Sequence, residues 1–241
     1  MITSPLSGSE YDGFDPRVIP EAAAAFFYRP GAEGDALETF RILHPAERVL
    51  VEHAAPIRQA DFGDARYCAH QALKALGRDD YSPILRGERG MPLWPHSVVG
   101  SMSHTKGLRG AVVAPRLMMR SMGLDIEVSQ PLEASVIDSI SSRKERQNLD
   151  VLRDHGIHNP ETILFSAKEA TYKAWFPVTR QWLGFDEAEL DLHPDGTFVS
   201  YILLSPSPIP FIEGRWQLSD GFIISTTTVP SGRSRADVYP E

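Results

Sequence analysis

The sequence predicts an α+β protein made of two similar halves that meet at a ligand cleft. Its 241 residues, 42% hydrophobic and 23% charged, have the composition of a soluble globular protein. The predicted elements run helices then strands, and this order repeats although the sequence itself does not. We place the boundary after residue 118, so that residues 1–118 form the N-terminal half and residues 119–241 the C-terminal half.

The N-terminal half opens with a lead-in over residues 1–30, whose Ser, Gly and Pro content predicts an irregular segment that docks on the body. Pro45 begins a short amphipathic helix over 44–54. Residues 57–77 form the clearest helix, since apolar residues recur every three or four positions and Gly77 marks the end. The breaks between the next three strands, at 98–104, 108–114 and 117–128, predict an antiparallel meander.

The C-terminal half repeats the order of helices before strands. Ser142 and Glu145 match a capping box at the start of a helix. Pro160 begins a second helix, which Pro177 is expected to stop after about four to five turns. Two hairpins with Pro-Asp-Gly and Ser-Asp-Gly turns complete the half, at 188–204 and 211–229.

The formal net charge of −8 argues against a nucleic-acid-binding protein, because such proteins present a basic surplus to phosphate. No apolar run approaches the roughly 20 residues of a membrane span, and the N-terminus lacks a secretory signal pattern, so we expect a cytoplasmic protein without membrane contact. Cys68 is the single cysteine, which excludes an internal disulfide and a cysteine-based metal site. Cys68, Trp175 and Trp182 are expected in the core.

Basic residues are nevertheless concentrated in one tract that holds Arg58, Arg66, Arg86 and Arg89. Arg58 and Arg66 lie on one predicted helix, about 12 Å apart along its axis and within about a quarter turn of each other. They are placed to reach the same ligand. A tract of this kind on an acidic protein indicates a small polyanion as ligand, and arginines on a solvated helix face are the alternative.

The stretch "MGLDIEV", residues 122–128, places two carboxylates on one face of a predicted strand. Side chains at i and i+2 point the same way, so Asp125 and Glu127 lie about 7 Å apart. A solvent-facing polar edge would explain the pair. A cation shared by both carboxylates is the alternative, and it needs a third ligand from elsewhere in the chain.

Glu169 is the candidate third ligand, because it lies in an aromatic stripe of its helix where a carboxylate is costly to desolvate. A capping box with Ser166 and a surface ion pair with Lys173 are the alternative explanations. Taken with Asp125 and Glu127, this carboxylate favours an oxygen-binding ion, Mg²⁺ or Mn²⁺. Lys173, one turn further along, is then placed to contact a phosphate oxygen.

The motif "GLDIE" at 123–127, followed by "FSAKEATYKAWFP" at 165–177, resembles the paired signatures of the 4'-phosphopantetheinyl transferases. The resemblance is to the large monomeric class that includes enterobactin synthase component D and its actinobacterial relatives. Upstream, "PILRGERGMPLWPHSVVGSMSHTKGLRGAVV" and "ARYCAHQALKALG" are similar to other elements of that class. The match covers about residues 55–185 and depends on the two downstream motifs together, since a lone D-x-E motif is unspecific.

This resemblance implies two α+β halves related by a pseudo-twofold axis, with coenzyme A in the cleft between them. It assigns the metal and the phosphates to the C-terminal half, with Asp125, Glu127 and Glu169 as Mg²⁺ ligands and Lys173 as a phosphate contact. It assigns the nucleotide end to the N-terminal half, through Arg58, Arg66, Ser103, His104, Arg86 and Arg89. Many relatives carry lysine at the last two positions, and because arginine is a planar fork and lysine a point donor, the phosphate geometry there departs from the family pattern.

The resemblance therefore implies a Mg²⁺-dependent enzyme that moves the phosphopantetheine arm of coenzyme A to a serine of an acyl or peptidyl carrier protein and releases 3',5'-ADP. Glu169 would accept the serine proton, directly or through a metal-bound water. A monomer is the family expectation. Two surfaces are candidates for docking an acidic carrier, the segment 142–151 and the apolar surface near Met118 and Met119.

Two other interpretations of the same residues stay open from the sequence. A metal-dependent hydrolase of a nucleotide pyrophosphate would use water in place of the serine. A non-catalytic coenzyme A-binding module would use the same cations without turnover. Neither explains the match over residues 55–185.

Overall fold

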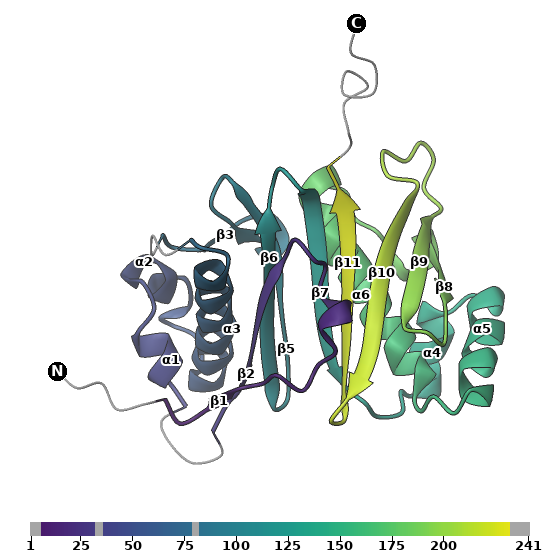
Figure 1. Ribbon diagram of the computed structural model, residues 1–241, viewed down its shortest axis with the longest axis horizontal. Coiled ribbons are helices and arrows are strands. Elements are labelled where there is room, and N and C mark those ends of the chain that lie inside the picture. Colours follow the sequence, from purple (N-terminus) through teal and green to yellow (C-terminus); the bar gives the residue numbers. More distant parts are fainter. Residues whose placement is uncertain (1–5, 32–35, 79–81, 232–241) are drawn as a thin grey trace, which may run out of the picture.

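The computed structural model describes residues 6–31, 36–78 and 82–231 and confirms the α+β fold (Figure 1). The elements of the N-terminal half are β1 (Ser9–Glu10), η1 (Pro16–Val18), β2 (Ala24–Arg29), α1 (Glu38–Arg41), α2 (Pro45–Arg48), η2 (Val49–Val51), α3 (Pro56–Ala75), β3 (Leu85–Arg86), η3 (Glu88–Gly90), β4 (Pro92–Leu93), β5 (Val98–Thr105) and β6 (Leu108–Pro115). Those of the C-terminal half are β7 (Met119–Val128), α4 (Ala134–Ile140), α5 (Arg143–Asp154), α6 (Pro160–Thr179), η4 (Phe185–Glu187), β8 (Ala188–Leu192), β9 (Thr197–Ile202), β10 (Phe211–Ser219) and β11 (Phe222–Pro230). Within the described ranges, no helix has the length and hydropathy needed to cross a bilayer.

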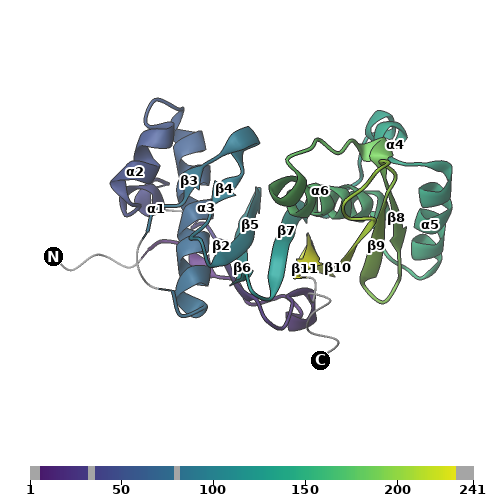
Figure 2. The same ribbon diagram turned by 90° about the horizontal axis from the view of Figure 1, so that it is seen from above.

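The strands form two antiparallel sheets and a small hairpin of β3 with β4. The first sheet has the order β1-β2-β6-β5 and the second the order β7-β11-β10-β9-β8. Helix α3 packs on the first sheet and α6 on the second (Figure 2). The two sheets are built in the same way. In each half, the strand that precedes the helices pairs with the last strand, β2 with β6 in the first sheet and β7 with β11 in the second. The pseudo-twofold relation and the boundary after residue 118 stay predictions.

The predicted three-stranded meander is wrong at its third member. β5 and β6 pair as expected, from Val98 opposite Pro115 to Thr105 opposite Leu108. β7 instead pairs with β11, near the other end of the chain. The reason is that β6 has no free edge, because β2 occupies the side that β7 would need.

The same strand β2 corrects the prediction of an irregular lead-in over residues 1–30. Residues 24–29 pair with β6, and Phe27 is fully buried there. Residues 11–23 are mostly irregular, and they dock on the second sheet where Thr226 of β11 donates its hydroxyl to the Val18 carbonyl. Residues 1–5 lie outside the described part of the chain. The strand is easily missed because it opens with alanines, which have low strand propensity.

The predicted limits of two helices are confirmed. α3 is followed by Gly77 at a φ of 78°, and the Gly77 N–H donates to the Lys74 carbonyl at 2.9 Å. α5 begins with the capping box of Ser142 and Glu145. The short helix expected over 44–54 is shorter than predicted, since it divides into α2 and one turn of 3₁₀ helix.

The prediction that Pro177 stops α6 is wrong, because the helix continues to Thr179. Pro177 has no N–H to donate to the helix ladder, but the ladder continues beyond it. The N–H of Arg180 still donates to the Phe176 carbonyl at 2.9 Å, and Arg180 then ends the helix in the left-handed conformation.

Close packing of α6 on β7 brings the helix to the face of the strand that carries the carboxylates. Gly123 lies directly under the helix, where a Cβ atom would overlap the carbonyl oxygen of Ala170. The hydroxyl of Thr227 on β11 donates to that same oxygen at 2.8 Å. The glycine of the "GLDIE" motif is therefore required by the approach of α6 to the sheet.

Candidate active site

The candidate site lies where the two sheets meet. β5 and β7, both fully described, are edge strands of their sheets and run side by side without a backbone ladder between them (Figure 2). A side chain makes the connection, since the Ile126 N–H of β7 donates to the Ser103 hydroxyl of β5 at 3.3 Å. Leu124 and Ile126 are buried on one face of β7. The other face therefore carries Asp125 and Glu127 toward α6.

Asp125 is buried, with 4% of its surface exposed, and it is paired with a lysine of α6. Lys173 Nζ donates to Asp125 Oδ1 at 2.7 Å and to the Ser103 hydroxyl at 3.0 Å, and this hydroxyl donates to the same Oδ1 at 3.0 Å. The second oxygen, Oδ2, is buried and has no hydrogen-bond partner among the described residues. The interpretation of the pair as a solvent-facing edge is therefore wrong for Asp125.

Glu127 and Glu169 are destabilised as anions in this setting. Burial raises the pKa of Glu127 to about 7, with the charges of Asp125 and Glu169 adding to the rise and Lys173 opposing it. Burial also raises the pKa of Glu169, and the charge of Asp125 adds to this effect. The capping-box explanation of Glu169 is wrong, because α6 begins at Pro160. The two glutamates together require more positive charge than Lys173 supplies.

The donor chemistry of these three carboxylates fits a hard divalent cation. The partnerless Oδ2 of Asp125 and the raised pKa values of both glutamates agree with this fit. The three side chains do not close into a ligand sphere, however. In the part of the chain that the structure describes, no group of three or more His, Cys, Asp or Glu residues is arranged to hold a metal ion.

Positive charge gathers on α3 and the neighbouring hairpin. Arg66 is only 6% exposed, its guanidinium lies 3.7 Å from the centroid of the Phe62 ring, and its Nε is buried without a hydrogen-bond partner among the described residues. Burial lowers the pKa of Arg66 to about 10, the charge of Glu47 opposes this, and the like charges of Arg86 and Arg58 add to it. Arg58, Arg66 and Arg86, called the cationic cluster below, are thus held together at an electrostatic cost that an anion would offset. For Arg66, the alternative of a solvated helix face is wrong.

His104 lies between the cationic cluster and the carboxylates. Burial lowers its pKa, and its charged neighbours are Asp61, Arg109, Arg58 and Lys173. Its Nε2 is 3.9 Å from Asp61 Oδ2, while Arg109 holds the other oxygen of that carboxylate at 2.7 Å. The charges of Arg58 and of Lys173 both lower the pKa of His104, so the two charged regions come close to each other at this residue.

Arg89, the remaining basic residue predicted for the ligand, does not belong to the cationic cluster. It has a left-handed backbone, with φ of 49°, and its guanidinium lies 5.2 Å from the centroid of the Trp182 ring. It lines a pocket of about 370 Å³ together with Glu169 and Lys173. Trp182, predicted for the core, is 59% exposed, whereas Trp175 is fully buried as predicted.

Sequence reasoning missed most of the wall of this pocket. The pocket runs along β5 and α6, and its further lining residues include Met91, Trp94, Arg116, Arg120, Tyr172, Phe176 and Arg180. The aromatic stripe of α6 was the sequence feature that could have predicted this wall. We interpreted it only as an unfavourable environment for Glu169, although the same stripe forms a wall for a ligand.

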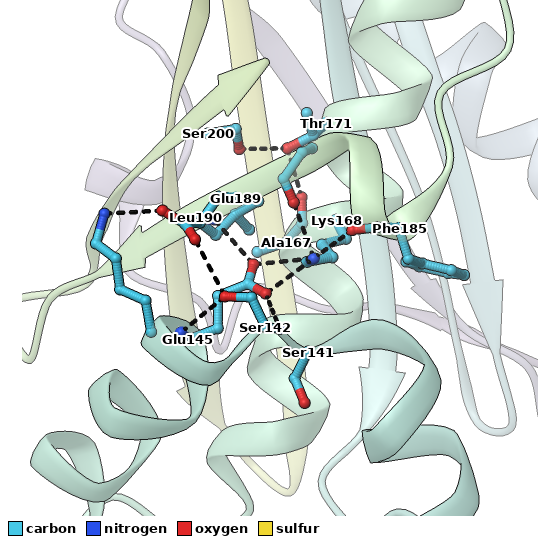
Figure 3. Close-up of polar contacts among 12 residues, drawn as sticks. Ser141, Ser142, Glu145, Ala167, Lys168, Thr171, Phe185, Glu189, Leu190 and Ser200 are labelled. Carbon is cyan, nitrogen blue, oxygen red and sulfur yellow. Dashed lines mark hydrogen bonds and ion pairs between the residues drawn. The ribbon is translucent and has the colours of Figure 1, made fainter. Parts of the chain in front are cut away.

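A second charged group of α6 was also missed. Lys168, the residue before Glu169, points into the C-terminal core (Figure 3). Its ammonium donates to two backbone carbonyls at 2.6 and 2.9 Å and lies 2.9 Å from Glu145 Oε1. Glu145 also accepts the N–H of Leu190 on β8 at 2.9 Å. This buried pair ties α5, α6 and β8 together and so fixes the helix that presents Glu169.

Two family models match the chain. One, described as 4'-phosphopantetheinyl transferase N-terminal domain, matches residues 46–114, and the other, described as 4'-phosphopantetheinyl transferase superfamily, matches residues 121–227. The chain is 41% identical to 4'-phosphopantetheinyl transferase Npt of Nocardia iowensis over 76% of its length and 87% of the relative. It is 41% identical to PptT of Mycobacterium tuberculosis, over 75% and 83% of the two chains, and 40% identical to Svp of Streptomyces mobaraensis, over 83% and 84%.

Proposed function

Because the chain belongs to the 4'-phosphopantetheinyl transferase superfamily, we infer that it transfers a 4'-phosphopantetheine group to carrier proteins. We propose that coenzyme A is the donor, that a serine hydroxyl of an acyl or peptidyl carrier protein is the acceptor, and that 3',5'-ADP is released. One observation carries the assignment of the site. Two regions of opposite charge are each short of counter-charge, and both supply charges that act on His104. Coenzyme A has the matching chemistry, since it combines a 3'-phosphate with a pyrophosphate that binds divalent cations.

The cationic cluster and His104 are assigned to the nucleotide end of coenzyme A. The buried, partnerless Nε of Arg66 supports this assignment, because an anion would offset the burial of its charge. Ser103, predicted with His104 at the nucleotide end, is hydrogen-bonded to Lys173 and Asp125, which supports a place for it between the nucleotide end and the pyrophosphate. Arg89 shares its pocket with Lys173 and is assigned to coenzyme A from that side.

Asp125, Glu127 and Glu169 would hold Mg²⁺, with Mn²⁺ as the alternative ion. When bound, the ion supplies positive charge against the charge that develops on the pyrophosphate oxygens. Lys173, one helical turn from Glu169, is placed to donate to a phosphate oxygen as well as to Asp125. Its ammonium therefore adds to the neutralisation from the protein side.

The reaction makes one bond at phosphorus and breaks another. The serine oxygen attacks the β-phosphorus of coenzyme A, and the bond from that phosphorus to the bridging oxygen breaks, so that 3',5'-ADP leaves with the electron pair. Glu169 is assigned to take the serine proton. The proton moves to this carboxylate directly or through a water molecule. The cations hold the pyrophosphate in position for the attack.

Both ends of the cleft come from one chain, which supports the prediction that the enzyme acts as a monomer. A cytoplasmic location also stays a prediction.

Intact-mass spectrometry of an apo carrier protein, incubated with the enzyme, coenzyme A and Mg²⁺, tests the proposed function. We expect the carrier to gain the mass of one phosphopantetheine group. The Glu169→Gln variant should give almost none, whereas Glu161→Gln, a matched change in the first turn of the same helix, should retain activity. Release of 3',5'-ADP with no change in carrier mass would instead indicate a hydrolase, and binding of coenzyme A without any product would indicate a binding module.

A further inference from the structure

The short connection between the two halves exposes two large apolar side chains. The linker turn, defined here as residues 116–120, joins β6 to β7. Leu117 is 91% exposed, the highest value among the exposed large hydrophobic residues in the described ranges, and Met118 is 57% exposed. Met119 is 8% exposed and belongs to the core, so the apolar surface consists of Leu117 and Met118.

Hydrogen bonds from two sides hold the linker turn in place. Arg116 donates its backbone N–H to the Ser97 carbonyl and its Nε to the His96 carbonyl, both at 2.8 Å. Ser231, beyond the end of β11, donates its hydroxyl to the Arg116 carbonyl at 3.0 Å and its N–H to the Met118 carbonyl at 3.2 Å. Apolar side chains on a fixed backbone lose little entropy on binding, which is typical of contact residues at interfaces.

The surroundings of the linker turn are basic, although the protein as a whole has a net charge of −8. The pocket beside the turn is lined by four arginines, Arg89, Arg116, Arg120 and Arg180. Glu169 is the one acidic residue of that lining in the described chain. Among the described residues, no hydrogen bond or ion pair is made by the side chain of Arg120. This local surplus is complementary to an acidic partner.

On the alternative docking surface, α5, most of the basic residues are already paired with carboxylates, and Arg143 is the exception among the described residues. Lys144 is paired with Glu189 at 2.9 Å, and Arg146 is paired with Asp138 at 3.0 Å. Arg153 is paired with both Asp150 and Glu161. An acidic partner that docked on α5 would meet one available arginine, Arg143, and would otherwise have to displace these carboxylates, whereas Arg120 lies beside the exposed Leu117 and Met118 and has none to displace.

The linker turn also lies next to the chemistry. Arg116 and Arg120 line the pocket that contains Glu169 and Lys173. A protein seated on the turn is therefore at the mouth of the cavity in which the proposed base lies.

We propose that the linker turn is the surface on which an acidic helical carrier protein docks. Leu117 and Met118 make the apolar contact, and Arg116 and Arg120 pair with carboxylates of the carrier. The inference depends on the proposed function, because it names the surface through which that function reaches its protein substrate.

Steady-state kinetics of the Leu117→Ser/Met118→Ser double variant test this proposal. The probe is an acidic apo acyl carrier protein that the wild-type enzyme modifies. We expect the KM for the carrier to rise by about tenfold or more, with kcat and the KM for coenzyme A unchanged within about twofold. Leu203→Ser, a matched change of a 56% exposed residue after β9, should leave all three constants unchanged. If the double variant does not fold, the same kinetics are measured with Leu117→Ala, which removes less apolar surface.

Charge is tested separately by salt dependence. The carrier KM of the wild-type enzyme should rise with NaCl concentration, and Arg120→Gln should weaken that dependence, whereas Arg146→Gln on α5 should not. A larger effect of Arg146→Gln would overturn the proposal in favour of α5. An effect of Arg120→Gln on coenzyme A affinity alone, measured by calorimetry, would assign Arg120 to the coenzyme and contradict its role in docking.

The proposed function and the proposed docking surface can fail separately. If wild-type enzyme modifies no carrier protein, the proposed function fails before the surface is tested. If it modifies the carrier and the double variant keeps the same carrier KM, the docking surface alone is wrong. Sedimentation analysis that shows a wild-type dimer and a monomeric double variant would mean that the surface joins two copies of this chain, which would also overturn the proposal.

Discussion

At the residue scale, the cleft is made of charged groups that the rest of the fold does not satisfy. Asp125 Oδ2 and Arg66 Nε are both buried without hydrogen-bond partners in the described chain. Such groups cost stability, because burial removes hydration that nothing in the protein replaces. Under the proposed function, coenzyme A and its metal ion would supply the missing partners.

Replacement of Arg66 should therefore separate binding from stability. We expect Arg66→Met to weaken coenzyme A binding by about tenfold or more, while the free energy of unfolding stays the same or increases, because methionine fills similar space without a buried charge. Calorimetric titration and urea denaturation measure the two quantities. Arg17→Met, a change of an exposed arginine outside the cleft, is the control and should alter neither. A clear loss of stability with full affinity for coenzyme A would show that Arg66 has a structural role instead.

The pKa of Glu127, raised to about 7 from its ordinary 4.5, predicts how stability depends on pH in the metal-free protein. The folded state holds this proton more tightly than the unfolded chain, so the contribution to stability is present below about pH 4.5 and is lost as pH rises through about 7. In EDTA, the free energy of unfolding should fall between pH 5 and pH 7.5 by a larger amount for wild type than for Glu127→Gln. Equal pH dependence of the two proteins in urea denaturation would contradict the raised pKa.

At the element scale, α6 does most to assemble the site, because it presents Glu169 and Lys173 to the cleft and Lys168 to the core. Adjacent residues on a helix point about 100° apart, so a single helix serves both purposes. The buried contacts of Lys168 with Glu145 and with two carbonyls therefore set the rotation at which Glu169 faces β7 (Figure 3).

Loss of one partner of this buried pair should be far more harmful than loss of both. Lys168→Met leaves Glu145 buried and unpaired, and we expect it to lower the free energy of unfolding by about 3–5 kcal/mol. Lys168→Met/Glu145→Gln removes both charges but keeps an acceptor for the Leu190 N–H, so it should recover a large part of that loss. A double-mutant cycle by urea denaturation measures the coupling. Strictly additive losses would show that the two residues do not act as a pair.

The sequence predicted helices better than strand partners. Gly77 and the Ser142–Glu145 box mark helix ends through local hydrogen bonds, and local patterns are visible in sequence. Pairing of β7 with β11 depends on residues about a hundred positions apart and on β2 taking the free edge of β6, which no local pattern contains. The end of α6 was misplaced because proline costs little in a last turn.

At the scale of the whole molecule, the proposed ligand contacts come from both halves. Arg58, Arg66, Arg86 and His104 come from the N-terminal half, and Asp125, Glu127, Glu169 and Lys173 from the C-terminal half. The motifs predicted these residues by type. Of the predicted residues, Arg89, Glu169 and Lys173 line one pocket, and the assignment of the others to the same ligand stays a prediction. The apolar surface near Met118 could be named from the sequence as a docking candidate. The pocket wall could not be predicted as a unit, because its residues come from separate segments that become neighbours only in the folded chain.

A ligand that contacts both halves should stabilise the molecule as a whole. At 100 times its dissociation constant, coenzyme A with Mg²⁺ should add about 2.7 kcal/mol to the free energy of unfolding. At the same concentration, coenzyme A that lacks its 3'-phosphate should add less, because the cationic cluster then has no anion. Thermal denaturation with each ligand, with and without EDTA, measures the difference. Equal stabilisation by the two ligands would show that the 3'-phosphate does not bind at the cationic cluster.

The gap between β5 and β7 also bears on how the protein avoids aggregation. An open sheet edge presents unpaired backbone groups that can recruit a strand from another chain. β5 and β7 are the longest edge strands among those described, and each faces the other inside the molecule. The outer edges are formed by the much shorter β1 and β8. The fold thus turns its longest sheet edges toward each other, where they are protected from pairing with a strand of another chain.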